Sequence, residues 1–156
     1  MNGRHLSLLA GAGSGALLVA ALGFQAAGYA PCELCILQRW PHLAAAVIAV
    51  GIAATGFRRA LAALGLVAAV LATAFAIYHL GVEQAWWAGP SACSGGLGDL
   101  SDVSTQDLLA RIQGAPVVRC DEPSWHFLGL TMAVWNAILS AVLAGVWAMA
   151  FRRSIR

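Results

Sequence analysis

Charge is scarce in this sequence of 156 residues. It has no lysine, only 10% of its residues are charged, and 60% are hydrophobic. A soluble domain carries roughly 25% charged and about 45–50% apolar residues, so the composition excludes an ordinary soluble protein. Because there is also no basic run and no acidic tail, nothing indicates nucleic-acid binding. The composition predicts an integral membrane protein.

Long apolar runs divide the chain into four stretches of membrane-spanning length. A bilayer core about 30 Å thick requires roughly 20 apolar residues in a helix. The predicted helices cover residues 6–27, 35–57, 61–80 and 127–151. Residues 28–34 and 81–126 form the two loops on the outer side of the membrane. We therefore expect one all-α membrane domain over residues 1–156, built as a four-helix bundle with two extracytoplasmic loops.

The first apolar run follows Arg4 and resembles a signal peptide, but it is longer than the usual 7–15 apolar residues, so we expect a retained helix.

Residues 104–114, "STQDLLARIQG", begin like a capping box and place apolar residues on one side. They predict a short amphipathic helix that lies on the outer membrane surface.

The arginines are distributed asymmetrically between the two sides. One side holds Arg4, Arg58, Arg59, Arg152, Arg153 and Arg156, whereas the other holds Arg39, Arg111 and Arg119. The positive-inside rule assigns the first group, and hence both termini, to the cytoplasm. All four cysteines then lie on the oxidising side, where an even number predicts two disulfides. They are Cys32, Cys35, Cys93 and Cys120.

The spacing of Cys32 and Cys35 admits three interpretations. A structural disulfide is a weak one, because a two-residue loop restrains little of the unfolded chain. A four-thiolate zinc site is also weak, because its second half should be another CxxC, and Cys93 and Cys120 are far apart. A redox-active pair fits best, since a local CxxC disulfide exchanges easily.

Arg39 supports the redox interpretation. In a helix, Cys35 and Arg39 form an i, i+4 pair, and a fixed cation favours the thiolate. The alternative is that Arg39 only extends to the lipid headgroups. The sequence has no CxxCH haem motif, no dinucleotide fingerprint and no iron–sulfur cysteine run. A lipid-soluble quinone would meet the need for an electron acceptor, with Arg39 polarising its carbonyl oxygen.

The segment "PCELCILQRWPHLA" resembles the first outer loop and second helix of the DsbB (disulfide bond formation protein B) family. The second cysteine pair in a long loop and "CDEPSWHFLGLTMAVWN" are also similar, so the resemblance covers nearly the whole chain. It implies a thiol:quinone oxidoreductase of the bacterial inner membrane. Such an enzyme reoxidises a periplasmic thioredoxin-like oxidase, DsbA, and passes the electrons to ubiquinone or menaquinone.

The resemblance also implies a role for each cysteine. The resting disulfides would be Cys32–Cys35 and Cys93–Cys120. Cys93 would form the mixed disulfide with the DsbA-like partner, and Cys120 would then attack the first pair at Cys32. Cys35 would face the quinone beside Arg39, and no metal is implied.

Three further residues carry weaker expectations. The resemblance puts His79 near the quinone ring, although an interfacial histidine with no special role is equally consistent with the sequence. We expect Gln38 to orient Arg39, and Glu83 to be a solvated loop residue. The alternative function is a non-enzymatic membrane scaffold that carries structural disulfides or a zinc site. The sequence leaves open which quinone is used and whether the partner is general or dedicated.

Overall fold

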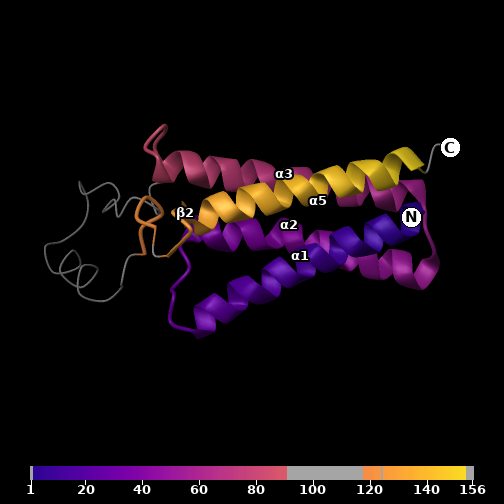
Figure 1. Ribbon diagram of the computed structural model, residues 1–156, viewed down its shortest axis with the longest axis horizontal. Coiled ribbons are helices and arrows are strands. Elements are labelled where there is room, and N and C mark those ends of the chain that lie inside the picture. The colour runs from indigo at the N-terminus through magenta and orange to yellow at the C-terminus, as the bar shows by residue number, and fades with distance from the viewer. Residues whose placement is uncertain (1, 91–117, 124, 154–156) are drawn as a thin grey trace, which may run out of the picture.

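Four helices dominate the computed structural model, which describes residues 2–90, 118–123 and 125–153 (Figure 1). Each of them is long and apolar enough to cross a membrane. Together they confirm the predicted all-α membrane fold. Their bounds are α1 Gly3–Ala26, α2 Glu33–Thr55, α3 Arg59–Glu83 and α5 Met132–Arg153. The amphipathic helix predicted at residues 104–114 lies outside the described residues.

Local chemistry sets the start and end of α2. Cys32 occupies the N-cap position, and its side chain accepts a hydrogen bond from the backbone N–H of Cys35. This is the role that serine or aspartate usually has at a helix start. The helix therefore begins at Glu33, upstream of the predicted residue 35, and Pro41 lies inside it as expected. It ends at Thr55 and is followed by the C-cap residue Gly56, whose φ of 89° is readily adopted by glycine.

A small hairpin delays the start of α5. Strands β1 (His126–Phe127) and β2 (Leu130–Thr131) pair antiparallel. The two turn residues, Leu128 and Gly129, both have positive φ, at 52° and 77°, as a tight primed turn requires. Thr131 then caps the helix, because its Oγ1 accepts a hydrogen bond from the backbone N–H of Val134. The last helix thus begins at Met132 and not at the predicted residue 127, since the hairpin occupies the intervening residues.

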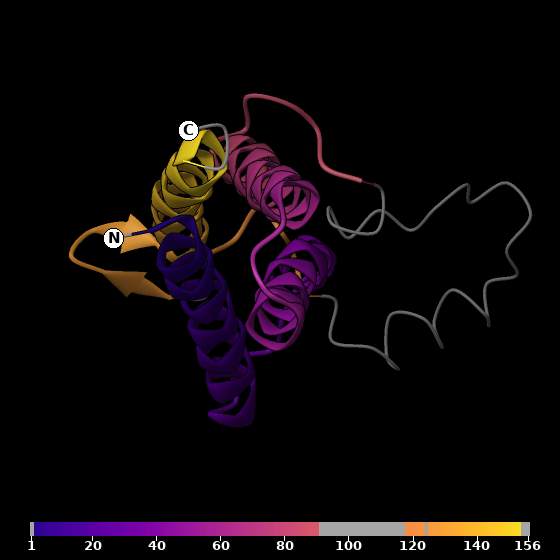
Figure 2. The same cartoon turned by 90° about the vertical axis from the view of Figure 1, so that its right-hand side faces the viewer.

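The four helices pack as a closed ring. Helix α1 contacts α2 and α5, helix α3 contacts the same two, and α1 and α3 lie on a diagonal (Figure 2). Small residues allow close approach of neighbouring helices: a Cβ built on Gly11 would lie 2.0 Å from the Cβ of Ala49. Such small contacts are typical of helices that pack within a membrane.

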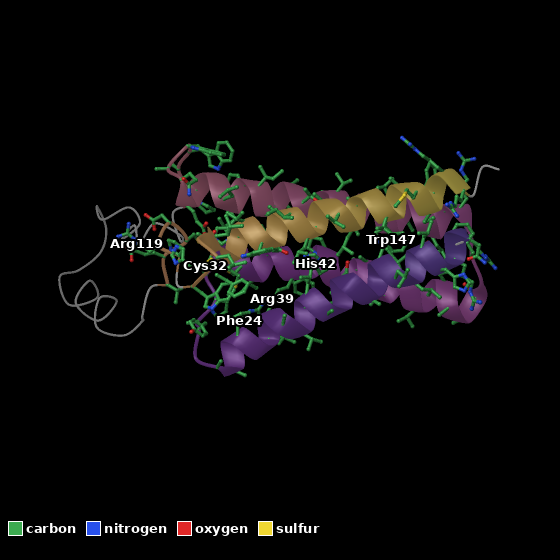
Figure 3. The ribbon with its side chains drawn as sticks, viewed as in Figure 1. Phe24, Cys32, Arg39, His42, Arg119 and Trp147 are labelled. Carbon is green, nitrogen blue, oxygen red and sulfur yellow. The ribbon has the colours of Figure 1, made fainter. Side chains whose placement is uncertain are left out.

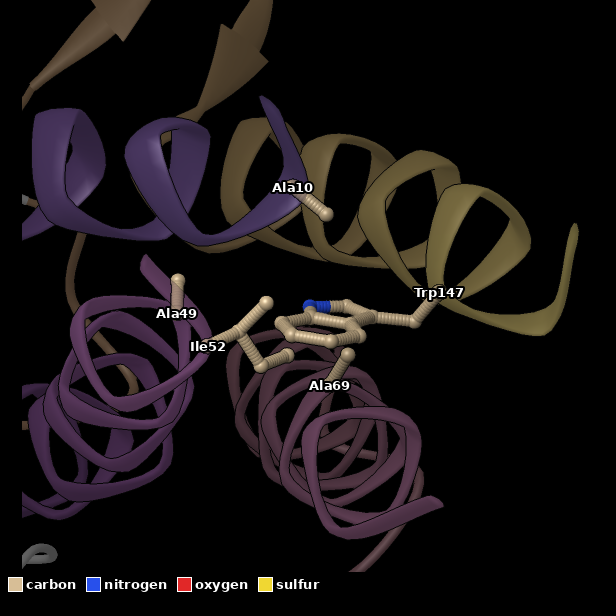
Figure 4. Packing of buried hydrophobic residues seen from close by; sticks show 5 residues of the cluster. All are labelled: Ala10, Ala49, Ile52, Ala69 and Trp147. Carbon is tan, nitrogen blue, oxygen red and sulfur yellow. The ribbon is translucent and has the colours of Figure 1, made fainter. Parts of the chain in front are cut away.

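A tryptophan fills the ring near the end that holds the termini. Trp147 is fully buried and packs with Ala10, Ala49, Ile52 and Ala69 (Figure 4). The small side chains of the three alanines leave the space that the indole ring fills. This packing closes that end of the bundle.

The other end of the bundle is more open. Both termini lie at one end of the long axis, whereas Cys32 lies at the opposite end (Figures 1 and 3). There the last turns of α1 diverge from the other helices. Large apolar side chains cover the outer faces of the helices, for example Val19 at 70% and Val50 at 68% exposed. Such surfaces suit contact with lipid chains.

Candidate active site

Cys32 and Cys35 lie together at the start of α2. The Sγ of Cys32 accepts a hydrogen bond from the backbone N–H of Cys35 at 3.3 Å. The two sulfurs are 3.0 Å apart and both cysteines are free, whereas a disulfide would bring the sulfurs to about 2.05 Å. The structure therefore describes the reduced form of the pair, and the Cys32–Cys35 disulfide stays a prediction.

The two thiols are not equivalent. The S–H of Cys32 donates to the Cys35 sulfur, and this hydrogen bond, together with burial, raises the pKa of Cys32 above its ordinary value. Cys32 is only 5% exposed, whereas Cys35 is half-buried. Cys35 lies in the first turn of α2, where the unpaired backbone N–H groups favour negative charge. Negative charge on the reduced pair is therefore favoured at Cys35.

Cys120 lies beside this pair. It is 1% exposed and belongs to the same buried cluster as Cys32, Leu34 and Val82. Cys120 is disulfide-bonded. Cys93 falls outside the described residues, so the predicted Cys93–Cys120 pairing stays a prediction. The packing brings one cysteine of the second outer loop next to the CxxC pair.

Gln38 fixes the ring of His79. Its Nε2 donates to the carbonyl oxygen of Leu34 at 3.0 Å and lies 2.8 Å from His79 Nδ1. Because a carbonyl oxygen only accepts, the amide nitrogen must face Leu34, and its second N–H donates to Nδ1. Neutral His79 therefore carries its proton on Nε2. That nitrogen lies 3.6 Å from Cys32 Sγ and 3.9 Å from Glu83 Oε1.

The expectations for Glu83 and Gln38 are both wrong. The Glu83 side chain is 4% exposed, and its Oε2 accepts a hydrogen bond from Thr131 at 2.6 Å. Because α3 continues past residue 80, Glu83 lies one turn after His79 on the same helix. Gln38 does not orient Arg39: its hydrogen bonds among the described residues go to Leu34, His79 and Asn136.

Helix α5 contributes polar residues that the sequence analysis missed. Asn136 donates from Nδ2 to Gln38 Oε1, and its Oδ1 lies 3.1 Å from His42 Nε2. The hydroxyl of Ser140 donates to the same Oδ1 at 3.3 Å. Isolated polar residues inside an otherwise apolar span are costly and usually functional. That signal was present at Asn136 and His42 and could have identified them.

Arg39 is held by the first helix. Its Nη1 donates to Gln25 Oε1 at 2.7 Å. Its Nε is buried and has no hydrogen-bond partner among the described residues. Arg39 is therefore held against α1 by one of its terminal nitrogens, while its Nε stays buried. Gln25, which closes this contact from α1, was not among the expected site residues.

A cavity of about 320 Å³ connects these groups. It lies between α1, α2, α5 and the segment before β1, and its wall is mainly apolar and aromatic. The thiol of Cys35 reaches it, together with the polar residues Gln38, Arg39, His42, His79 and Asn136. Aromatic rings surround the outer part and include Phe24, Tyr29, Trp125, Phe127 and Trp135. The cavity has the size and character of a site for a small apolar ligand with a few polar atoms.

A zinc ion is disfavoured at this site. The ligand atoms of Cys32, Cys35 and His79 all lie within 4.8 Å of one another, which suits a Cys₂His centre. A metal on Nε2 would place the remaining proton of His79 on Nδ1, where it needs an acceptor. Gln38 presents a donor to that nitrogen. The hydrogen-bond network therefore favours redox chemistry over the metal alternative.

Comparison with known proteins agrees with the geometry. The sequence profile of the family described as "Disulfide bond formation protein DsbB" matches residues 3–150. The chain belongs to the DsbB family. Membership gives it an oxidoreductase role in disulfide bond formation and confirms the resemblance seen in the sequence. No solved structure matches the chain.

Its curated relatives include bacterial proteins named for the same process. Disulfide bond formation protein B of Xanthomonas oryzae pv. oryzae is 31% identical over 127 residues, which cover 78% of this chain and 73% of that protein. The protein of the same name from Xanthomonas campestris pv. campestris matches with the same identity and coverage. An uncharacterized protein of Rickettsia prowazekii is 25% identical over 118 residues, or 74% of this chain and 67% of that protein.

Proposed function

We propose that this DsbB-family protein oxidises a periplasmic DsbA-like thiol oxidase and passes two electrons to a membrane quinone. One observation carries the proposal: Cys35 belongs both to the CxxC pair and to the wall of the apolar cavity. A thiol pair that borders such a cavity can exchange electrons with a ligand dissolved in the bilayer. The alternative of an inert scaffold gives no reason for this arrangement.

The residues present fit a quinone. The ring would lie among apolar and aromatic side chains, while Arg39 Nε, which is buried and lacks a partner among the described residues, offers a hydrogen bond to a ring oxygen. Cys35 and His79 line the same cavity. A bound quinone supplies an acceptor for two electrons and two protons.

The cysteines would transfer electrons in two exchanges. In the first, a thiolate of the reduced partner attacks the Cys93–Cys120 disulfide at Cys93 and releases the Cys120 thiolate. The partner's second thiol then displaces Cys93, so the partner leaves as a disulfide. In the second, Cys120 attacks Cys32 and releases Cys35 as a thiolate. Cys93 then attacks Cys120, which reforms the loop disulfide and leaves Cys32 and Cys35 reduced.

The packing supports the second exchange. Cys120 and Cys32 share one buried cluster, so the attack needs no large movement of Cys120. The Cys32–Cys35 dithiol then loses two electrons and two protons to the quinone and becomes a disulfide again. Arg39 would stabilise negative charge on the quinone oxygen in a site that excludes water.

The orientation belongs to the same proposal. The arginine asymmetry supports cytoplasmic termini and periplasmic cysteines, and membership of the DsbB family supports a bacterial inner membrane. The structure is compatible with it, because the termini and Cys32 lie at opposite ends of the bundle (Figures 1 and 3).

Quinone reduction by the purified protein tests the proposal. Reduced DsbA-like partner and a short-chain quinone are mixed with catalytic amounts of the protein, and loss of quinone absorbance is followed. We expect turnover that requires both substrates and is abolished by Cys93→Ser. Turnover that continues in that variant, or no turnover with any quinone, would contradict the proposal.

A further inference from the structure

His42 is a buried histidine, and its ring nitrogen Nδ1 plays no part in the hydrogen-bond network described above. Its side chain belongs to α2, one turn deeper in the bundle than Arg39, and it lines the same cavity (Figure 3). The residue is 5% exposed. Its Nδ1 is buried and has no hydrogen-bond partner among the described residues. A buried polar atom without a partner is costly, so this nitrogen indicates a missing ligand.

The hydrogen-bond chain determines what Nδ1 can bind. Since the Leu34 carbonyl fixes the amide of Gln38, Gln38 Oε1 accepts from Asn136 Nδ2, and Asn136 Oδ1 is left as an acceptor. Neutral His42 must then donate from Nε2 to that oxygen. Its Nδ1 carries only a lone pair. The partner it lacks is therefore a hydrogen-bond donor.

This requirement distinguishes the two redox forms of a quinone. The oxidised ring has carbonyl oxygens, which only accept hydrogen bonds, whereas the quinol has hydroxyl groups, which also donate. We propose that His42 Nδ1 accepts a hydrogen bond from a quinol hydroxyl and so makes the cavity bind quinol more tightly than quinone. The proposal rests on the function proposed above. Arg39, which only donates, can bind an oxygen of either form.

Preferential binding of the quinol would help the overall reaction. A DsbA-like partner is strongly oxidising and gives up electrons reluctantly. If the cavity binds quinol about tenfold more tightly than quinone, the potential of the bound couple rises by about 30 mV for two electrons. His42 would thus draw electrons from the cysteine pair through product binding, with no contact to sulfur.

The competing explanation is that His42 only positions Asn136. Two substitutions separate these roles. The side-chain nitrogen of His42→Gln can reach the Nε2 position and still donate to Asn136, but this variant lacks an acceptor at the Nδ1 position. The amide oxygen of His42→Asn replaces Nδ1, but this variant loses the contact with Asn136. Ser140→Ala is the matched control, because Ser140 contacts Asn136 and His42 but does not line the cavity.

Binding is measured without turnover. Each substitution is placed in a Cys35→Ala protein, which cannot exchange electrons, and quenching of the cavity tryptophans Trp125 and Trp135 is titrated with a short-chain quinone and with its quinol. Ubiquinone and menaquinone analogues are both used. We expect His42→Gln to weaken quinol binding about tenfold, or about 1.4 kcal/mol, with quinone binding unchanged. His42→Asn and Ser140→Ala should keep the preference for quinol.

Each other outcome overturns the inference. Unchanged quinol affinity in His42→Gln would show that Nδ1 binds no hydroxyl. Equal losses in His42→Gln, His42→Asn and Ser140→Ala would show a purely structural histidine. If the Cys35→Ala protein bound neither form while the unsubstituted protein also failed to reduce quinone, the proposed function itself would fail. Reduction of quinone with no preference for quinol would overturn only the role of His42.

Discussion

The Cys32 and Cys35 thiols have different environments although three positions separate them. Cys32 is buried, caps α2 and donates its S–H to Cys35, which raises its pKa above the ordinary value of 9.0. Cys35 lines the cavity and lies at a helix N-terminus. The pair is therefore divided between a sulfur that faces Cys120 and a sulfur that faces the proposed electron acceptor.

This division predicts unequal alkylation. In the reduced protein at pH 7, a small alkylating reagent should modify Cys35 first, because only a thiolate reacts and Cys32 stays protonated. The rate at Cys32 should be low at neutral pH and should still be rising above pH 9.0, since its pKa lies above that value. Peptide mapping of briefly alkylated protein over a pH series measures both rates. Faster labelling of Cys32 at neutral pH would contradict the proposed division.

Arg39 gives a second prediction at this scale. Arg39→Met keeps some bulk but removes the cation, so use of quinone should fall at least tenfold, which is about 1.4 kcal/mol or more in the transition state. Arg39→Lys keeps a charge without the planar fork and should be impaired less. Steady-state rates over a quinone concentration series measure both effects.

Two controls define the Arg39 result. Arg152→Met removes an arginine from the opposite end of the bundle and should leave the rate unchanged. Formation of the mixed disulfide with the reduced partner should survive in Arg39→Met, because the proposed exchange uses Cys93 and not the cavity. Wild-type quinone dependence in Arg39→Met would mean that this arginine is only an anchor.

The sequence identified those site residues that stand at a regular spacing within one segment. The CxxC pair and the i, i+4 arginine were visible as a pattern, and Cys35 and Arg39 do line one cavity. His42 and Asn136 were marked only as polar residues within apolar spans, and the sequence did not show that they line one cavity. The contact of Gln25 with Arg39 joins two helices, so no local spacing indicated it. Glu83 was misjudged because the end of α3 could not be located from hydropathy alone.

At the scale of helices, the apolar runs predicted the number and order of the spans but not their ends. Caps and turns set the helix ends. The Cys32 cap lets α2 begin before the predicted residue 35, and the hairpin before Met132 makes α5 begin after the predicted residue 127. A thiol cap and a leucine with positive φ are not typical boundary signals. Hydropathy therefore located the helix ends only to within about five residues, or between one and two turns.

Helix packing yields a prediction about stability. A Cβ built on Gly65 of α3 would lie 2.4 Å from the buried ring of Trp147. Gly65→Ala should therefore destabilise the protein by about 1–3 kcal/mol through overpacking. Gly51→Ala is the control, because a Cβ there meets nothing within 4 Å and alanine favours a helix. Thermal unfolding in detergent compares the two, and an unchanged midpoint for Gly65→Ala would show that the contact is not tight.

In the whole molecule, the bundle is closed at one end, around Trp147, and holds the cavity near its other end. The proposed chemistry would therefore take place at one side of the membrane. The arginine distribution predicts that this side faces the periplasm. After reduction of intact cells, a membrane-impermeant thiol reagent should label the cysteines. A single cysteine introduced at Ser154, beside the C-terminal arginines, should be labelled only after the cells are opened. The reverse pattern would contradict the orientation.

Electron transfer from the CxxC pair to a quinone is the central claim, and a single turnover measures it without the soluble partner. The protein is reduced, freed of reductant and mixed with excess quinone, and quinone absorbance and the thiol state of Cys32 and Cys35 are followed together. We predict that one quinone is reduced for each protein disulfide formed, counting the loop pair, whose electrons pass through Cys32 and Cys35, and that Cys35→Ser reduces none. Disulfide formation without loss of quinone, or equal quinone reduction by Cys35→Ser, would contradict the account.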